Sequence, residues 1–148
     1  MILLGVLILL AIIVNITVIL LVKMREERDC ECSNVAGWKR NFIKYYSVCA
    51  LLVLLLVYII PLWLRLFKIK TIGTQLTKFI MSSPFQLLLS IFIAFGFFNL
   101  YFIFRYTKQL EDVKCDCENK NELMMRKALY YYSIIVITIY TIIEYIFL

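Results

Sequence analysis

The sequence predicts an all-α membrane protein with four transmembrane helices, built as two parallel-repeat helical hairpins, plus a short interfacial amphipathic helix. Hydrophobic residues make up 64% of its 148 residues and the mean hydropathy is +0.89. Globular proteins have about 45–50% apolar residues. A chain this short cannot cover so much apolar surface in water, so we expect lipid to be its main solvent.

Four apolar segments have the length that a bilayer requires, about 20 residues at 1.5 Å per residue. These segments are Ile2–Val22, Tyr45–Phe67, Phe85–Phe104 and Ala128–Leu148. The first lacks a basic leader and a small-residue cleavage site, which favours a retained signal-anchor over a cleaved signal peptide. Pro61 predicts a kink near the end of the second span. The segments 23–44 and 105–127 are polar, and we expect them to be loops.

The connection 68–84 alternates apolar and polar residues with helical spacing. Its apolar residues are Ile69, Ile72, Leu76, Phe79 and Ile80, and lysines and threonines take the other face. This pattern is typical of a short helix that lies in the plane of the membrane.

The composition excludes several classes of function. The chain has no histidine, which excludes bis-histidine haem, most catalytic zinc or copper sites and imidazole-based triads. The net charge of +6 comes from basic residues that flank the apolar segments, where they meet lipid headgroups. We therefore expect the lipid bilayer and proteins as partners, and no nucleic acid, small-molecule substrate or cofactor. An enzyme is not expected, and thiol–disulfide chemistry is the one enzymatic option.

The two halves of the chain carry the same motifs in the same order. Cys30-Glu31-Cys32 recurs as Cys115-Asp116-Cys117 at an offset of 85, and Arg40–Ser47 recurs as Arg126–Ser133 at an offset of 86. We infer a duplication within one membrane domain, residues 1–148, with repeat 1 at 1–67, the connector at 68–84 and repeat 2 at 85–148. Because each repeat holds two spans, both Cys-x-Cys segments are expected on the same side of the membrane.

The distribution of basic residues favours a cytosolic location for the Cys-x-Cys side. Twelve basic residues flank the spans on that side: Lys23, Arg25, Arg28, Lys39, Arg40, Lys44, Arg105, Lys108, Lys114, Lys120, Arg126 and Lys127. Four lie on the other side: Arg65, Lys68, Lys70 and Lys78.

Four loop thiols form the one constellation with chemistry in it, namely Cys30, Cys32, Cys115 and Cys117. They fit disulfides between the loops, a four-thiolate metal site, a redox-active pair or free thiols. No metal site is favoured, because structural zinc sites usually place two to four residues between the cysteines. An acid lies between the cysteines of each pair and disfavours thiolates. We therefore favour disulfides.

Two further sets of polar residues lie in or near the spans. Asn15 and Asn99 lie in the first span of each hairpin, where a buried amide predicts an interhelical hydrogen bond. Glu144 is the one acid inside a span, and we expect it either to pair with Arg65, Lys68 or Lys70 or to lie exposed at the interface, with Arg65 as the candidate partner. Two asparagines and one peripheral acid are few polar groups for a channel or transporter.

The stretch from Cys30 to Ser47 reads Cys-x-Cys-Ser, then Trp38-x-Arg40, then Tyr-Tyr-Ser. It resembles hydrophilic loops in small multi-span membrane proteins of large nucleocytoplasmic DNA viruses. The second copy, Cys115 to Ser133, keeps the cysteine pair, the arginine and the tyrosines, but lacks the tryptophan and the serine after the pair.

That resemblance implies a structural protein of a virion, its internal membrane or a host endomembrane. Its Cys-x-Cys loops would contact capsid or scaffold partners, or a second copy of the chain. Viruses of that class encode thiol oxidases, which would permit disulfides on a cytosolic face. Two alternatives stay open, namely a four-span membrane thiol oxidase and a small channel or transporter.

Overall fold

The computed structural model describes residues 2–27, 37–112 and 120–147. The described residues form helices and contain no strand, which confirms the all-α fold class. The elements are α1 (Ile2–Glu26), α2 (Gly37–Leu54), a π-helical turn η2 (Leu55–Ile59), α3 (Ile60–Leu66), α4 (Lys70–Ile80), α5 (Ser83–Asp112) and α6 (Lys120–Phe147).

Four helical segments are long and apolar enough to cross a membrane: α1, the continuous run Gly37–Leu66, α5 and α6. This confirms the four predicted spans, and α4 is the predicted short amphipathic helix. The expectation that the polar segments are loops throughout is wrong. Part of each is helical, because α2 begins at Gly37, α5 continues to Asp112 and α6 begins at Lys120.

Pro61 causes a local change of helix type. Proline has no N–H donor, and its ring clashes with the carbonyl four residues earlier, so a regular α-helix cannot pass through it. The chain accommodates it with η2, after which the Ile60 N–H donates to the carbonyl of Leu55. The irregularity lies where the sequence predicts a kink, and it takes the form of a π turn.

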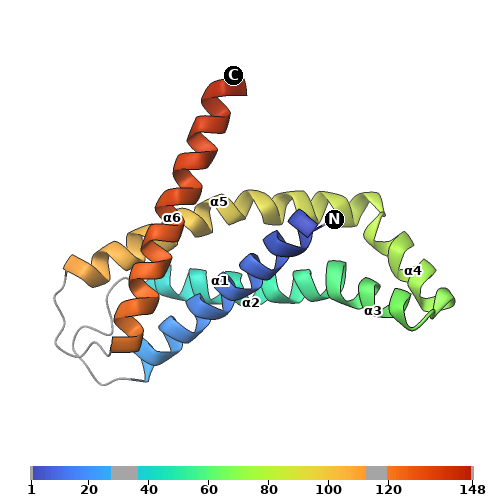
Figure 1. Cartoon of the computed structure of the whole chain (residues 1–148), viewed down its shortest axis with the longest axis horizontal. Helices are drawn as coiled ribbons and strands as arrows, with labels where there is room; N and C mark the ends of the chain where they lie inside the picture. Colours follow the sequence, from blue (N-terminus) through green and yellow to red (C-terminus); the bar gives the residue numbers. More distant parts are fainter. Residues whose placement is uncertain (1, 28–36, 113–119, 148) are drawn as a thin grey trace.

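The four spans contact one another in a ring. α1 packs on α2, α2 on α5, α5 on α6, and α6 on α1. Figure 1 shows α4 at one end of this bundle and the last turns of α1 and first turns of α6 at the other. The last turns of α6, drawn in red, lead away from the other helices, whereas Tyr140 further back still contacts Phe97 of α5.

The apolar core lies near the end of the bundle where α1 ends and α6 begins. It consists of Val18, Leu21, Val22, Ile43, Ile103, Tyr106, Leu110 and Leu129. Toward the other end, large side chains such as Leu4, Leu62, Leu88 and Ile142 are exposed, as expected for surfaces in lipid. In lipid the hydrophobic effect does not bring helices together. The apolar core therefore lies where the helix ends approach water.

The buried positions repeat between the two hairpins. Val18, Leu21, Val22 and Arg25 of α1 are buried, and so are Ile103, Tyr106, Thr107 and Leu110 of α5, at an offset of 85. Ile43 and Ser47 of α2 match Leu129 and Ser133 of α6 at an offset of 86. These are the offsets of the repeated motifs, so both hairpins bury corresponding positions. In this register Asn99 corresponds to Val14 rather than to Asn15.

Candidate functional site

Charged side chains from all four spanning segments gather where the helices extend beyond their apolar runs. We call this group the ionic cluster. Its members are Arg25 and Glu26 of α1, Arg40 and Lys44 of α2, Glu111 of α5, and Glu122 and Arg126 of α6. The sequence brings them together because each lies within about two turns of the polar end of a span.

The central contact of the ionic cluster is a buried ion pair between α1 and α6. Arg25 Nε lies 3.5 Å from Glu122 Oε2, and the two side chains are 2% and 0% exposed. The helix dipoles favour both charges, since Arg25 is in the last turn of α1 and Glu122 in the first turn of α6. Burying two charges costs several kcal/mol each, so this pair adds less to net stability than the attraction between its charges alone would.

Two further ion pairs repeat between the hairpins. Arg40 of α2 lies 3.8 Å from Glu26 of α1, and Arg126 of α6 lies 3.8 Å from Glu111 of α5. The arginines are 86 residues apart and the glutamates 85 apart, which are the offsets of the internal repeat. Lys44 adds a second contact to Glu26, at 2.5 Å. Each hairpin is therefore closed by its own pair, and Arg25–Glu122 joins one hairpin to the other.

Aromatic side chains surround the ionic cluster. The ring of Phe102 receives Trp38 and Phe42 edge-on, with centroid distances of 5.2 and 5.1 Å. Tyr106, 1% exposed, lies within electrostatic reach of both Arg25 and Glu122. Because the Tyr106 ring is buried, it keeps water away from the charges near it, which strengthens the attraction between them.

A second contact between the hairpins lies deeper in the bundle. The Tyr46 hydroxyl of α2 donates to the carbonyl of Phe92 in α5 at 3.0 Å, and the two rings stack with centroids 4.7 Å apart. Gly96 makes this approach possible, because a Cβ there would lie 2.9 Å from Tyr46 Oη. The neighbouring Tyr45 is exposed, as expected of an interfacial tyrosine.

The four loop cysteines, Cys30, Cys32, Cys115 and Cys117, lie outside the described residues. The structure does place the helix ends that flank them. Arg25 precedes Cys30 by five residues, and Glu122 follows Cys117 by five residues. The ion pair Arg25–Glu122 therefore holds the end of α1, which precedes the first Cys-x-Cys segment, next to the start of α6, which follows the second.

Asn15 and Asn99 do not contact each other in the described hydrogen bonds. The Asn15 side chain donates to the Ala11 carbonyl in its own helix at 2.7 Å. Asn99 is 7% exposed, and its Oδ1 has no hydrogen-bond partner among the described residues. The interhelical hydrogen bond stays a prediction for both.

The structure does not bring Arg65 and Glu144 together. Both side chains are exposed, and no ion pair of the described residues joins them. Figure 1 shows why: Glu144 belongs to the end of α6 that leads away from α3.

Sequence reasoning missed Glu122 and its pairing with Arg25. The sequence pattern indicates only that the basic residues near the Cys-x-Cys segments set the topology, and it predicts a loop at 120–127. One available signal was the spacing of Glu122 and Arg126, which are four residues apart and therefore share a helix face. The match of Glu26 and Glu111 at the offset of the repeat is a signal for the two repeated ion pairs, not for the Arg25–Glu122 pair.

Comparisons with protein-family models, with curated protein sequences and with solved structures give no match.

Proposed function

We propose that this chain is a structural integral membrane protein that presents its two Cys-x-Cys segments as one polar surface to a protein partner. The observation that carries the proposal is the buried Arg25–Glu122 pair. It joins the two hairpins where both Cys-x-Cys segments leave their helices. Helix ends that are joined in this way suit binding, since groups that are held rigid lose less conformational entropy on association.

The repeated ion pairs support the same reading. Glu26 with Arg40, and Glu111 with Arg126, each tie the helices that flank one Cys-x-Cys segment. With the Arg25–Glu122 pair, all four helix ends belong to one network. The spans supply attachment to the bilayer, because their apolar side chains are exposed along most of their length.

The partner we propose follows from the resemblance of Cys30–Ser47 to the loops of viral membrane proteins. It is a capsid or scaffold protein that meets the Cys-x-Cys side of a virion membrane. The test is fractionation of infected-cell material with an antibody to this chain. The chain should be enriched in purified particles relative to a host-membrane marker. Confinement to host membranes, with none in particles, refutes the viral structural role.

For the thiols, we propose disulfides that link Cys30 or Cys32 to Cys115 or Cys117. Such a link would close a loop of about 85 residues and stabilise the chain by a few kcal/mol. Intact mass should increase by two hydrogens for each disulfide on reduction and should not fall on chelation. A mass lost on chelation would instead show a metal, and no change in either treatment would show free thiols.

The thiol oxidase alternative has its own measurement. A variant with Cys30→Ser and Cys32→Ser should transfer disulfides to a reduced protein substrate no more slowly than the native chain, since we propose no such activity. If the native chain transfers disulfides at a measurable rate and the variant does not, the chain is a thiol oxidase and the structural proposal is wrong.

A further inference from the structure

A second polar site lies at the opposite end of the bundle, between α3 and α4. A cavity of about 570 Å³ is lined there by the last turn of α3 and by the polar face of α4. Lys70, Gly73, Thr74, Thr77 and Lys78 come from α4 at helical spacing, and Arg65 and Lys68 come from α3 and the turn that follows it.

In the part of the chain that the structure describes, the cations of this cavity have no acidic partners. No Asp or Glu occurs anywhere from residue 33 to residue 110. Among the described residues, Arg65, Lys68, Lys70 and Lys78 take part in no ion pair. The cations of the ionic cluster, by contrast, pair with glutamates of the chain. An external anion is therefore the chemistry that this end of the bundle fits.

The backbone places Lys68 at the cavity in an unusual conformation. The Ile69 N–H donates to the Leu64 carbonyl and the Lys68 N–H to the Arg65 carbonyl, which is the hydrogen-bond pattern of a Schellman motif. Lys68 takes the left-handed position of that motif, with φ of 56°. Glycine usually fills this position because it has no Cβ to clash.

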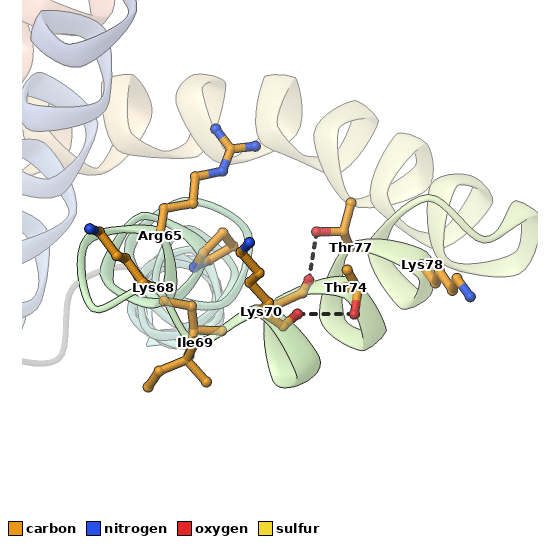
Figure 2. Close-up of a pocket in the computed structure, with 10 residues that line it drawn as sticks. Arg65, Lys68, Ile69, Lys70, Thr74, Thr77 and Lys78 are labelled. Atoms are coloured by element: carbon orange, nitrogen blue, oxygen red, sulfur yellow. Dashed lines mark hydrogen bonds between the residues drawn. The ribbon is translucent and has the colours of Figure 1, made fainter.

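Figure 2 shows how the side chains lie around the cavity. Arg65, Lys68 and Lys70 extend their charged groups on the same side of the α3–α4 turn. The hydroxyls of Thr74 and Thr77 donate to backbone carbonyls of α4, at 3.0 and 2.8 Å. Their oxygens are thereby held in place, and the lysine and arginine donors remain to bind an anion.

An apolar groove meets this cavity. About 600 Å³ in volume, it lies between α1 and the η2–α3 segment and is lined by Leu4, Ile8, Ile12 and Leu62. Pro61 and Arg65 line both the groove and the cavity. One ligand with a charged head and an apolar tail can therefore occupy both spaces at once.

We infer that this composite site binds an anionic phospholipid of the surrounding leaflet. Its phosphate lies among Arg65, Lys68 and Lys70, and an acyl chain lies in the groove between α1 and α3. The position agrees with this assignment, since an amphipathic helix such as α4 lies at headgroup depth. Basic pockets between transmembrane helices on the cytoplasmic or matrix side bind anionic headgroups, so this assignment places α4 on that side, opposite to the sidedness that the basic residues favour.

The test is lipid binding to the full chain in nanodiscs of phosphatidylcholine, with phosphatidylglycerol added as the probe. The triple variant Arg65→Gln, Lys68→Gln, Lys70→Gln should bind phosphatidylglycerol about a hundredfold more weakly. A matched triple variant at the other end, Lys108→Gln, Lys120→Gln, Lys127→Gln, removes the same charge from exposed residues. It should bind within about twofold of the native chain.

Lys68→Gly separates binding from folding. Glycine relieves the left-handed conformation, so the melting temperature in phosphatidylcholine should stay equal or rise. Affinity for phosphatidylglycerol should nonetheless fall about fivefold, the effect of one cation near an anionic surface.

Three results would overturn the assignment. The first is an equal loss of affinity for phosphatidylglycerol in both triple variants. The second is an affinity of Lys68→Gly for phosphatidylglycerol equal to that of the native chain. The third is binding of glycerol phosphate or inorganic phosphate as tight as that of the lipid. The last would show a phosphate site that makes no use of the apolar groove.

Discussion

The substitution Glu122→Gln tests whether the ionic cluster holds the two hairpins together. It keeps the size and shape of the side chain and removes one charge. Arg25, which is 2% exposed, then keeps its charge in the bundle interior without this carboxylate at 3.5 Å. Breaking a buried ion pair by removing one partner typically costs about 3 to 5 kcal/mol. We expect a loss of that size in the free energy of unfolding.

A matched control is available one turn from the cluster. Glu27 pairs with Lys23 at 3.9 Å, but both side chains are about two-thirds exposed, at 66% and 65%. Exposed pairs of this spacing contribute about 0.3–0.5 kcal/mol. Glu27→Gln removes the same charge from the same helix end, and we expect it to change stability by no more than that.

The measurement is unfolding in mild detergent micelles titrated with a denaturing detergent. Trp38 fluorescence serves as the probe, in a Trp63→Phe background, because Trp38 packs on Phe102 beside the cluster. A double variant, Arg25→Met with Glu122→Leu, should regain most of the loss. Replacing both partners of a buried pair by apolar residues is often neutral or stabilising.

A cost below about 1 kcal/mol for Glu122→Gln, equal to that of Glu27→Gln, would refute the reasoning. So would a double variant that is less stable than the single one, because the stability would then depend on Arg25 itself rather than on its pairing with Glu122.

Two further predictions use the same titration. Gly96→Ala places a methyl group 2.9 Å from Tyr46 Oη and should cost about 1 kcal/mol through the lost interhelical hydrogen bond. In contrast, Gly5→Ala meets no atom within 4 Å and should be neutral or stabilising; equal effects of the two variants would contradict close packing at Gly96. Ser47 is fully buried, and its hydroxyl has no hydrogen-bond partner among the described residues, so Ser47→Ala should be neutral or stabilise by about 1 kcal/mol. Its counterpart Ser133→Ala removes a 2.8 Å hydrogen bond and should destabilise instead; a loss of similar size in Ser47→Ala would show that its hydroxyl is bonded in the bilayer.

The spans and the amphipathic connector could be predicted because hydropathy and residue spacing are local properties of the chain. The ends of the helices could not be predicted from the same properties. Residues such as Lys120 and Glu122 have the polarity of a loop, yet they continue α6 for two turns outside its apolar run. Their helical state depends on partners in other helices, which a local pattern does not contain.

The candidate site was predicted in part through the internal repeat. The match of Arg40 with Arg126 marked two residues that the structure places in equivalent ion pairs. The Arg25–Glu122 pair has no such signal. The two residues lie 97 positions apart in the sequence, and Arg25 is not repeated, because Leu110 occupies the equivalent position in repeat 2. A single contact that breaks the symmetry of a duplicated chain is visible only when the two copies are packed together.

The location of the core at one end of the bundle has a consequence for the membranes in which this chain can reside. Helices adapt to bilayers of different thickness by tilting, and packing against neighbours restricts that tilt. Here the core residues and the ion pairs lie near the end of α1 and the start of α6, whereas the last turns of α6 lead away from the other helices (Figure 1). The last turns of α6 can thus change tilt as the bilayer thickens or thins, while the ionic cluster keeps its geometry. A protein built in this way can pass between compartments of different membrane thickness with its polar end unchanged.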